Sequence, residues 1–533
     1  MILRVAMILR AVTMYRFVLG VAIALASAAA PAAAATFAGY GTVSFPTSCS
    51  PDVQPGFDEV VARLHSFDWV ESEALAITKT DPHCAMAFWA AAMGARGNPL
   101  ANLPDADTLK QGHALIQQAQ AALDEDPGAT ETERAYIAAL DVYYRDYPGG
   151  HPARTQAYEA AMEKVYRLQP DDPEAATFYA LAILEAVDLT DKTYARQLKA
   201  IAILNRVWQA HPDHPGAMHY LIHAADYAPL AQQGLAAARL YPLIATASAH
   251  AQHMPAHIYS MLGLWRDSIA ANHAASNVIC QGRHIDETTA DTTDAHGLDF
   301  ISYARLQLGE DAEVDAAVAQ APPSSERILV QARSVLERHD WPAAAMLPES
   351  SDNVLDRLTL HFTRSIAASR SGDPLTARAE ASALRAERER VLSDYGTYWA
   401  GLTDVYADAA DAWIAAKAGN AEDAIAKMQQ SATRDDGREK HIWLENKLLP
   451  MRELYGELLL ELNKPDQALT AFEASLVSGP NRLRSFTGAA LAARALGKDD
   501  IARQWQTKIV ELTAGIETSR PEVLEARATV AKP

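Results

Sequence analysis

The sequence predicts an all-α fold, built as an array of stacked helix pairs (an α-solenoid). Apolar residues follow a helical period along most of the 533 residues, and no convincing alternating strand is present. Turn-forming prolines recur at regular intervals, since Pro82, Pro127, Pro173 and Pro215 are 45, 46 and 42 residues apart. A chain of this length also exceeds what a single core needs, which favours a repeat array.

Residues 1–35 are expected to form a signal peptide. Three basic residues, Arg4, Arg10 and Arg16, accompany the apolar stretch 17–30, and small residues end at Ala35. We expect cleavage after Ala35 and export to a bacterial periplasm or secretion; a retained membrane anchor is the alternative interpretation. No later segment has the roughly 18 or more uninterrupted apolar residues of a spanning helix, so no stable membrane insertion is expected after cleavage.

The charge of the chain disfavours nucleic acid as a partner. Residues 1–35 hold three arginines and no acidic residue, so the rest carries 44 Lys and Arg against 67 Asp and Glu, a formal net charge of −23. An acidic chain without a basic patch has no attraction for a phosphate backbone. We therefore expect no nucleic-acid binding.

Three cysteines are too few for a disulfide scaffold or a thiolate cage around a metal. In an exported protein, Cys49, Cys84 and Cys280 permit one disulfide and leave one thiol. Cys49 and Cys84 are the closest pair in sequence, so we expect the bond between them.

Regular turns mark the helix pairs of the N-terminal half. A proline is followed closely by an alanine that we expect to open the next helix, as at 173–175 and 215–217. Proline suits the first helical turn because its missing N–H would have no partner there. Intervals of about 44 residues fit one helix pair per unit, somewhat longer than the 34 residues of a tetratricopeptide (TPR) repeat.

A TPR unit is clearest near the C-terminus, between Arg452 and Pro480. Small residues and an aromatic stand at relative positions 8, 20, 24 and 32 of the unit, namely Gly456, Ala468, Phe472 and Pro480. Small residues at the first two positions allow two helices to approach closely, and Phe472 is expected to fill the space between them. A second copy, with Gly488 and Ala502, follows in residues 481–512.

We expect two lobes in the exported protein. The run 321–325, Ala-Pro-Pro-Ser-Ser, indicates a hinge between an N-terminal helical-repeat lobe of residues 36–320 and a C-terminal TPR lobe of residues 321–533. The polar stretch 281–293 lacks an apolar helical stripe, so we expect a loop there, beside the groove of the N-terminal lobe.

Histidines concentrate in one part of the chain, with ten of the seventeen between His211 and His296. The spacing of His219, His223 and Asp226 places them on one helical face. The spacing of His250, His253 and His257 does the same, provided that the segment is helical through Pro255, which would kink a helix already under way.

The two sets of histidines are in repeat register. His219 lies 34 residues before His253, and His223 lies 34 residues before His257, which is one TPR period. Aligning Gly263 with Gly309, 46 residues later, carries His250 onto His296 and His253 onto Asp299. We therefore expect three neighbouring helices to direct His or Asp side chains at one part of a concave groove.

These residue types predict a divalent-metal site, with zinc, copper or iron as the ion. The predicted ligands are His219, His223, His250, His253 and His257; His296, Asp226 and Asp299 are further ligands or groups that orient them. Three histidines with an open position would indicate a metal-dependent enzyme, whereas an exposed site would indicate a carrier. The alternatives are a metal-free TPR groove that holds a peptide, a protein partner or a small molecule, and histidines that only make structural hydrogen bonds.

Other polar residues are assigned no site role. His211 and His214 stand in a proline-rich turn and are expected to face solvent. A solvated helix face is favoured over a site role for Glu439, Lys440 and His441.

The histidine segments resemble a family of bacterial exported TPR proteins. The resemblance lies in HPGAMHYLIH at 214–223 and HAQHMPAHIY at 250–259, followed by Leu262, Gly263 and Trp265, and extends from about Phe57 to Ile509. Ala90 and Ala256 depart from the Gly and Ser that are frequent in the family. The family is described mainly as repeat proteins, so the resemblance implies the fold and export but no reaction.

Overall fold

The computed structural model describes residues 35–37, 39–101, 103–145, 150–283 and 294–532. The expected signal peptide lies outside these residues except for Ala35, so its cleavage and the export of the chain stay predictions. The helix that ends at Arg283 includes the first three residues of the expected loop 281–293, and that part of the prediction is wrong. The remainder of that loop lies outside the described residues.

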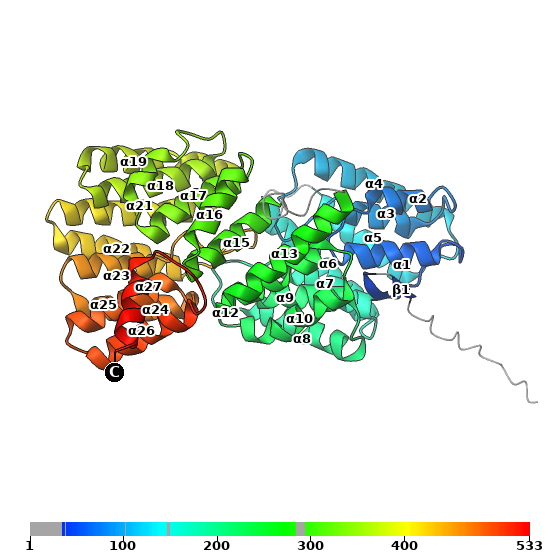
Figure 1. The fold of residues 1–533 in the computed structure, drawn as a ribbon. Helices are drawn as coiled ribbons and strands as arrows, with labels where there is room; N and C mark the ends of the chain where they lie inside the picture. The colour runs from blue at the N-terminus through cyan, green and yellow to red at the C-terminus, as the bar shows by residue number, and fades with distance from the viewer. Residues whose placement is uncertain (1–34, 38, 102, 146–149, 284–293, 533) are drawn as a thin grey trace, which may run out of the picture. The chain divides into compact units, whose positions relative to one another are not determined.

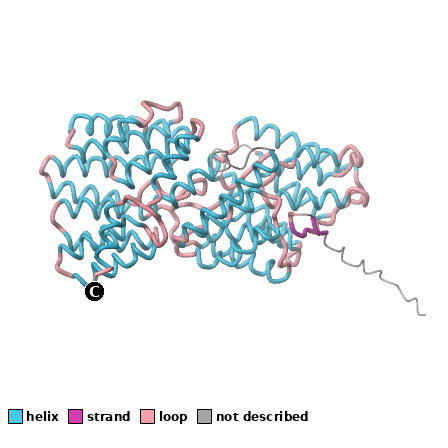
Figure 2. The backbone as a smooth tube through the Cα atoms, in the orientation of Figure 1, coloured by secondary structure: helices cyan, strands magenta, loops and turns pink. Residues whose placement is uncertain are grey.

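The fold is all-α, as predicted, and its helices form TPR-like pairs. Figure 1 shows the pairs side by side along the chain, and Figure 2 shows that almost all of the described backbone is helical. One small hairpin was not expected. Its strands, β1 (Ala35–Phe37) and β2 (Gly41–Val43), pair antiparallel and are too short to show an alternating pattern in sequence.

The N-terminal half begins with two short helices, α1 (Gln54–Leu64) and α2 (Glu71–Ile77), beside the hairpin. Successive helices then pack as pairs: α3 (Ala85–Gly94) with α4 (Ala106–Glu125), α5 (Glu131–Tyr144) with α6 (Gly150–Leu168), α7 (Pro173–Glu185) with α8 (Ala195–Ala210), and α9 (Pro215–Ala225) with α10 (Ala231–Ile244). The short α11 (Ala249–His253) precedes α12 (Pro255–Leu262), which packs with α13 (Trp265–Arg283), and α15 (Ala295–Leu308) packs with α16 (Asp311–Gln320).

The C-terminal half continues the array. Its first elements are α17 (Ser325–Arg338), the 3-10 helix η2 (Trp341–Met346), α18 (Val354–Ser371), α19 (Pro374–Ala386) and α20 (Arg388–Tyr395). The later pairs are α21 (Thr397–Lys417) with α22 (Ala421–Asp436), α23 (Met451–Glu461) with α24 (Pro465–Ser478), and α25 (Leu483–Ala495) with α26 (Asp499–Leu512), followed by α27 (Pro521–Val530). Residues 321–324 lie between α16 and α17, and Ser325 is the first residue of α17. The division of the chain into lobes there stays a prediction.

Close packing at the predicted small positions confirms the C-terminal TPR unit. A Cβ atom on Gly456 would lie 2.8 Å from the ring of Phe472, and one on Gly488 would lie 2.2 Å from the same ring. Phe472 therefore fills the space between α23 and α25, and a larger residue at either glycine would displace it.

The predicted proline turns also lie at the starts of helices, but the position of the proline relative to the first helical residue differs from one turn to the next. Pro173 and Pro215 are themselves the first residues of α7 and α9, whereas α3 begins three residues after Pro82. Pro255 is the first residue of α12, so it ends one helix and starts another instead of kinking a continuous one.

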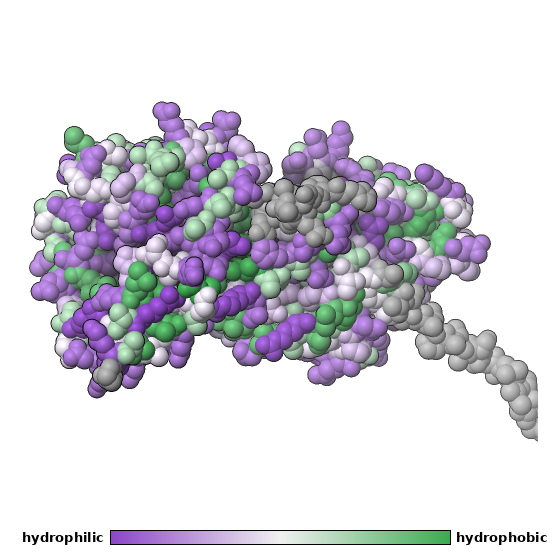
Figure 3. Space-filling model, viewed as in Figure 1, coloured by the Kyte–Doolittle hydropathy of each residue, from purple (hydrophilic) through white to green (hydrophobic). Residues whose placement is uncertain are grey.

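Two large apolar clusters make up most of the core. The first extends from Val43 through α12, and the second from Ala332 through α25. The face seen in Figure 3 is largely hydrophilic, with hydrophobic residues in separate patches. No helix among the described residues has the length and apolar composition to cross a membrane.

The disulfide expected between Cys49 and Cys84 is present, and Cys280 is a buried free thiol. The bond joins the segment before α1 to the start of α3, across 35 residues of sequence. In the chain-entropy account, closing a loop of that length lowers the conformational entropy of the unfolded chain and so raises the free energy of unfolding by about 3–4 kcal/mol.

We therefore expect reduction to lower the free energy of unfolding of the metal-free protein by about 3–4 kcal/mol. Urea unfolding with and without a phosphine reductant measures the difference. A double variant, Cys49→Ala with Cys84→Ala, should be as stable with the reductant as without it. A wild-type protein that is indifferent to reduction would contradict the expectation.

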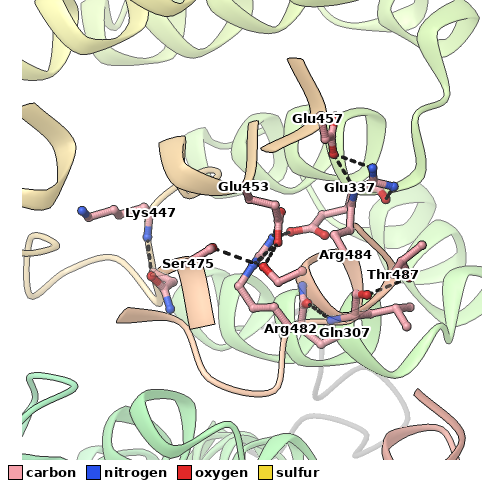
Figure 4. A network of polar contacts seen from close by, with 12 residues as sticks. Gln307, Glu337, Lys447, Glu453, Glu457, Ser475, Arg482, Arg484 and Thr487 are labelled. Carbon is pink, nitrogen blue, oxygen red and sulfur yellow. Dashed lines mark hydrogen bonds and ion pairs between the residues drawn. The ribbon is translucent and has the colours of Figure 1, made fainter. Parts of the chain in front are cut away.

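A buried ion network joins repeats of the C-terminal half to one another and to α15 (Figure 4). The Arg482 guanidinium donates to Glu453 on α23 and to Glu337 on α17, and also to the hydroxyl of Tyr303 on α15. Arg482 and Glu453 have no exposed surface. One guanidinium thus balances two carboxylates that come from different repeats.

Candidate metal centre

Four helices bring the histidines together. His219 and His223 lie on α9, whose neighbour α12 carries His257. The break between α11 and α12 places His250 and His253 on α11, at the end of the loop from α10. His296 comes from the first turn of α15. Repeat register therefore brings the two predicted pairs close together, although His253 and His257 lie on two successive helices instead of one.

The first group consists of His219, His223 and His250. The Nε2 atoms of His223 and His250 each lie 3.0 Å from Nε2 of His219. Ligand atoms bonded at about 2.0–2.1 Å to one tetrahedral ion lie about 3.3–3.4 Å apart, so this spacing is close to that of ligands that share an ion.

A backbone carbonyl sets the tautomer of His219. Its Nδ1–H donates to the carbonyl oxygen of His65 at 2.6 Å, which leaves the Nε2 lone pair facing the other two imidazoles. One lone pair cannot accept two N–H bonds in good geometry. An ion bound by all three Nε2 atoms would satisfy them together.

The second group consists of His253, His257 and His296, and ligand atoms of all three lie within 4.8 Å of one another. Nε2 of His253 lies 3.1 Å from Nε2 of His257. His253 Nδ1 lies 2.7 Å from the amide oxygen of Asn272. That oxygen must face the imidazole, because the amide nitrogen of Asn272 donates to the Ser268 carbonyl at 2.8 Å.

A carboxylate sets the tautomer of His257 in the same way. Its Nδ1–H donates to Asp226 Oδ2 at 2.8 Å, and the Lys440 ammonium donates to the same oxygen at 2.7 Å. Carboxylate–histidine pairs of this kind orient metal ligands. Nδ1 carries the proton in both His253 and His257, so their Nε2 lone pairs point at each other across 3.1 Å. Two such lone pairs repel unless a cation lies between them.

Burial keeps all six imidazoles neutral. It lowers the pKa of His219 to about 3 and the pKa of His253 below its ordinary value, and it holds the pKa values of the other four well below 6.5. A neutral imidazole is the form that binds a metal, so the site loses no free energy to deprotonation at neutral pH.

The two groups are neighbours. The ring centroids of His223 and His257 are 5.9 Å apart, and those of His250 and His253 are 6.3 Å apart. Phe67 packs against the first group and Phe300 against the second. These ring contacts restrict the rotation of the imidazoles.

Two details of the predicted arrangement are wrong. The histidines form two groups instead of converging on one point, because His250 turns toward His219 and His253 toward His257. Asp299 belongs to neither group; it pairs with Arg333 and accepts the backbone N–H of Glu445 at 3.1 Å. Asp226 lies behind His257 as one of the orienting groups that the sequence suggested.

A segment from the C-terminal half, residues 437–450, crosses the site. The sequence did not indicate that it would do so. We call it the crossing segment. Its Lys440 pairs with Asp226, and the ring of Trp443 lies 4.8 Å from that of His296. Lys440 is buried rather than solvated, contrary to expectation. In the sequence, the one sign of a site role was a lysine between two titratable residues. Its partner Asp226 lies 214 residues away, so no sequence pattern pairs the two residues.

A third cluster, His65, Glu174 and His214, also has metal-type spacing but is already satisfied. His65 Nε2 and His214 Nε2 lie 2.7 and 3.0 Å from the two carboxylate oxygens of Glu174. The remaining nitrogens accept from the Tyr220 hydroxyl and the backbone N–H of Ala217. His214 is buried, so the expectation that it faces solvent is wrong, whereas His211 is exposed as expected.

This third cluster should govern stability in acid. Burial alone would raise the pKa of Glu174, but His214 and His65 bring it down to about 2. A carboxyl whose folded pKa is depressed stabilises the fold above its unfolded pKa of about 4.5 and loses that contribution as the pH falls toward 2. The shift corresponds to roughly 3 kcal/mol.

We expect Glu174→Gln to lower the free energy of unfolding at pH 6 and to flatten its decline between pH 4.5 and pH 2. Urea unfolding at several pH values measures both effects. Glu131→Gln, at an exposed position, is the matched control and should follow the wild type. Parallel pH profiles for wild type and Glu174→Gln would contradict the assignment.

The remaining cluster of metal-type residues, Cys49, Asp81 and Cys84, offers no thiolate because its two sulfurs form the disulfide.

Comparisons with known proteins assign no function to the histidine groups. No protein-family model matches the sequence, and no curated protein matches it. Among solved structures, the human IFIT1 dimer with m7Gppp-AAAA is similar at 10% identity over 80% of this chain and 90% of that chain, with a TM-score of 0.35. A monomeric mutant of IFIT1 with Gppp-AAAA is similar at 11% identity over 79% and 89%, with a TM-score of 0.35. Similarity at this level is no guide to the function of this chain.

Proposed function

We propose that this TPR-like protein binds divalent metal ions, one at each three-histidine group. The observation that carries the proposal is the pair of Nε2 lone pairs on His253 and His257, 3.1 Å apart. Asn272 and Asp226 hold both rings in tautomers that place no proton between them. A cation removes the repulsion that this buried arrangement otherwise contains.

The donor set limits the choice of ion. Neutral imidazoles without thiolates suit zinc, copper or iron, and three nitrogen ligands leave a coordination position open. Such a position activates a bound water or binds a substrate oxygen, which supports a role as a metal-dependent enzyme. Because residues 1–35 have the features of a signal peptide, we propose that this role is carried out in the periplasm or after secretion.

The competing interpretation, a metal-free groove for a peptide or protein, expects histidines spread along an open channel. The six histidines instead gather in two compact groups whose members are buried or nearly so. The geometry therefore favours ions over an extended partner.

Metal analysis tests the proposal. Protein purified without a histidine tag and dialysed against metal-free buffer should hold about two ions per chain after loading with zinc or copper, as the two groups imply. Loading below about one ion per chain with each of zinc, copper and iron would overturn the proposal.

A further inference from the structure

An apolar cavity is lined in part by the crossing segment. Its volume is about 490 Å³, which is within the range of small-molecule sites. The walls come from α17, α18, α20, α21 and the crossing segment, and include Leu329, Leu358, Tyr395, Trp399, Tyr406 and Trp443. Aromatic and aliphatic side chains of this kind hold the flat or branched apolar part of an organic molecule.

The charge of the cavity walls limits the kinds of ligand that the cavity can bind. Glu326 and Asp356 line the cavity, and no lysine or arginine does so among the described residues. Asp356 already accepts hydrogen bonds from Ser325 and Ser351. An anion would meet carboxylates and no positive partner, whereas a neutral or cationic aromatic molecule would stack on the tryptophans and tyrosines.

A smaller cavity of about 150 Å³ adjoins the apolar cavity and lies against the first histidine group. The two cavities share Ala101, Leu103 and His441, and His223 lines the smaller one. On its other side the apolar cavity is lined by Trp443, whose ring lies 4.8 Å from that of His296. Of the six histidines, His223 is the one that lines either cavity, so the two cavities lie against the first group.

Three residues that line the smaller cavity carry a buried polar atom without a partner among the described residues. Glu185 Oε1, His151 Nδ1 and His223 Nδ1 belong to lining residues and make no hydrogen bond within the described part of the chain. The other oxygen of Glu185 pairs with Arg96, and burial raises the pKa of Glu185 to about 7. Buried polar atoms are normally satisfied, so three of them in one small space indicate a polar group that binds there.

We propose that the two cavities form one substrate site, which takes a neutral or cationic aromatic molecule with a polar end. The aromatic part fills the apolar cavity against Trp399, and the polar end enters the smaller cavity beside His223. The inference rests on the proposed function, because it assigns the substrate class of the metal bound at the first histidine group.

Binding of a neutral fluorescent probe, N-phenyl-1-naphthylamine, tests the site. We expect binding to the zinc-loaded protein that weakens about tenfold or more in Trp399→Ala, since a tryptophan commonly dominates the binding energy of a small contact surface. The matched control is Trp208→Ala, which removes a tryptophan from a different surface hollow and should leave affinity unchanged. The anionic probe 8-anilinonaphthalene-1-sulfonate should bind the wild type more weakly than the neutral one.

Proximity to the metal is measured separately. Replacing zinc with paramagnetic cobalt should enhance the relaxation of the protons of the bound probe, and Trp399→Ala should retain its full metal content. Equal probe affinity in Trp399→Ala and wild type, or no cobalt effect on the bound probe, would overturn the inference while leaving the proposed function intact. Absence of metal binding in the wild type would instead overturn the proposed function.

Discussion

His253→Ala is expected to lower the metal content from about two ions per chain to about one. The variant removes one of the two imidazoles whose Nε2 lone pairs face each other, and leaves His257 and His296 without their third ligand. Loss of an outer partner alone commonly reduces metal affinity about 10–100-fold, so loss of a ligand should cost at least that much.

The first group should respond independently. His219→Ala is expected to remove the other ion, because both remaining imidazoles of that group are positioned around His219 Nε2. The double variant His219→Ala with His253→Ala should bind no metal. Elemental analysis after dialysis gives the stoichiometry, and circular dichroism confirms that each variant remains helical.

His211→Ala is the matched control for both variants. His211 lies in the same part of the sequence but is exposed and belongs to neither group. Its loss should leave the stoichiometry at about two. Equal metal content in His253→Ala, His211→Ala and the wild type would show that the histidine groups do not hold the ions.

Arg482→Met is expected to destabilise the C-terminal half by about 3–5 kcal/mol. The substitution removes the guanidinium that pairs with Glu337 and Glu453, and both carboxylates remain almost fully buried. A buried charge that loses its partner retains the cost of its desolvation without the compensating attraction. Methionine fills most of the space of the arginine side chain, so the variant removes the charge with little change in volume.

Urea unfolding of the metal-free protein measures the effect of Arg482→Met. Arg503→Met, at an exposed position on α26, is the control and should change stability by less than about 0.5 kcal/mol. Adding Glu337→Gln and Glu453→Gln to Arg482→Met should recover part of the loss, because the uncompensated charges are then gone. A loss below about 1 kcal/mol in Arg482→Met would contradict the role given to the network.

Helical periodicity and turn residues were sufficient to predict the architecture. The proline turns, the glycines of the C-terminal repeat and Phe472 act over short distances, between helices that are adjacent in sequence. The 34-residue register of the histidines is of the same kind, because adjacent repeats stack in a regular way. These features depend on local conformation and nearest-neighbour packing, which a sequence pattern records directly.

The grouping of the histidines could not be predicted from spacing. His250 and His253 are three residues apart on α11, yet their Nε2 atoms meet different partners. Which imidazoles meet depends on the rotation of each helix and on the break at Pro255. A change of a few tens of degrees in helix rotation moves a side chain from one group to the other.

By itself, the sequence determined that the chain forms TPR-like helix pairs, that Cys49 pairs with Cys84, and that histidines from adjacent repeats lie near one another. Only the tertiary structure decided that they form two groups, that Lys440 and Asp226 stand behind His257, and that Asp299 serves Arg333 instead. The physical reason is the separation along the sequence of the residues that interact. Helix formation and repeat stacking are set by neighbours along the chain, whereas the tautomers and the burial of the imidazoles are set by groups up to 214 residues away.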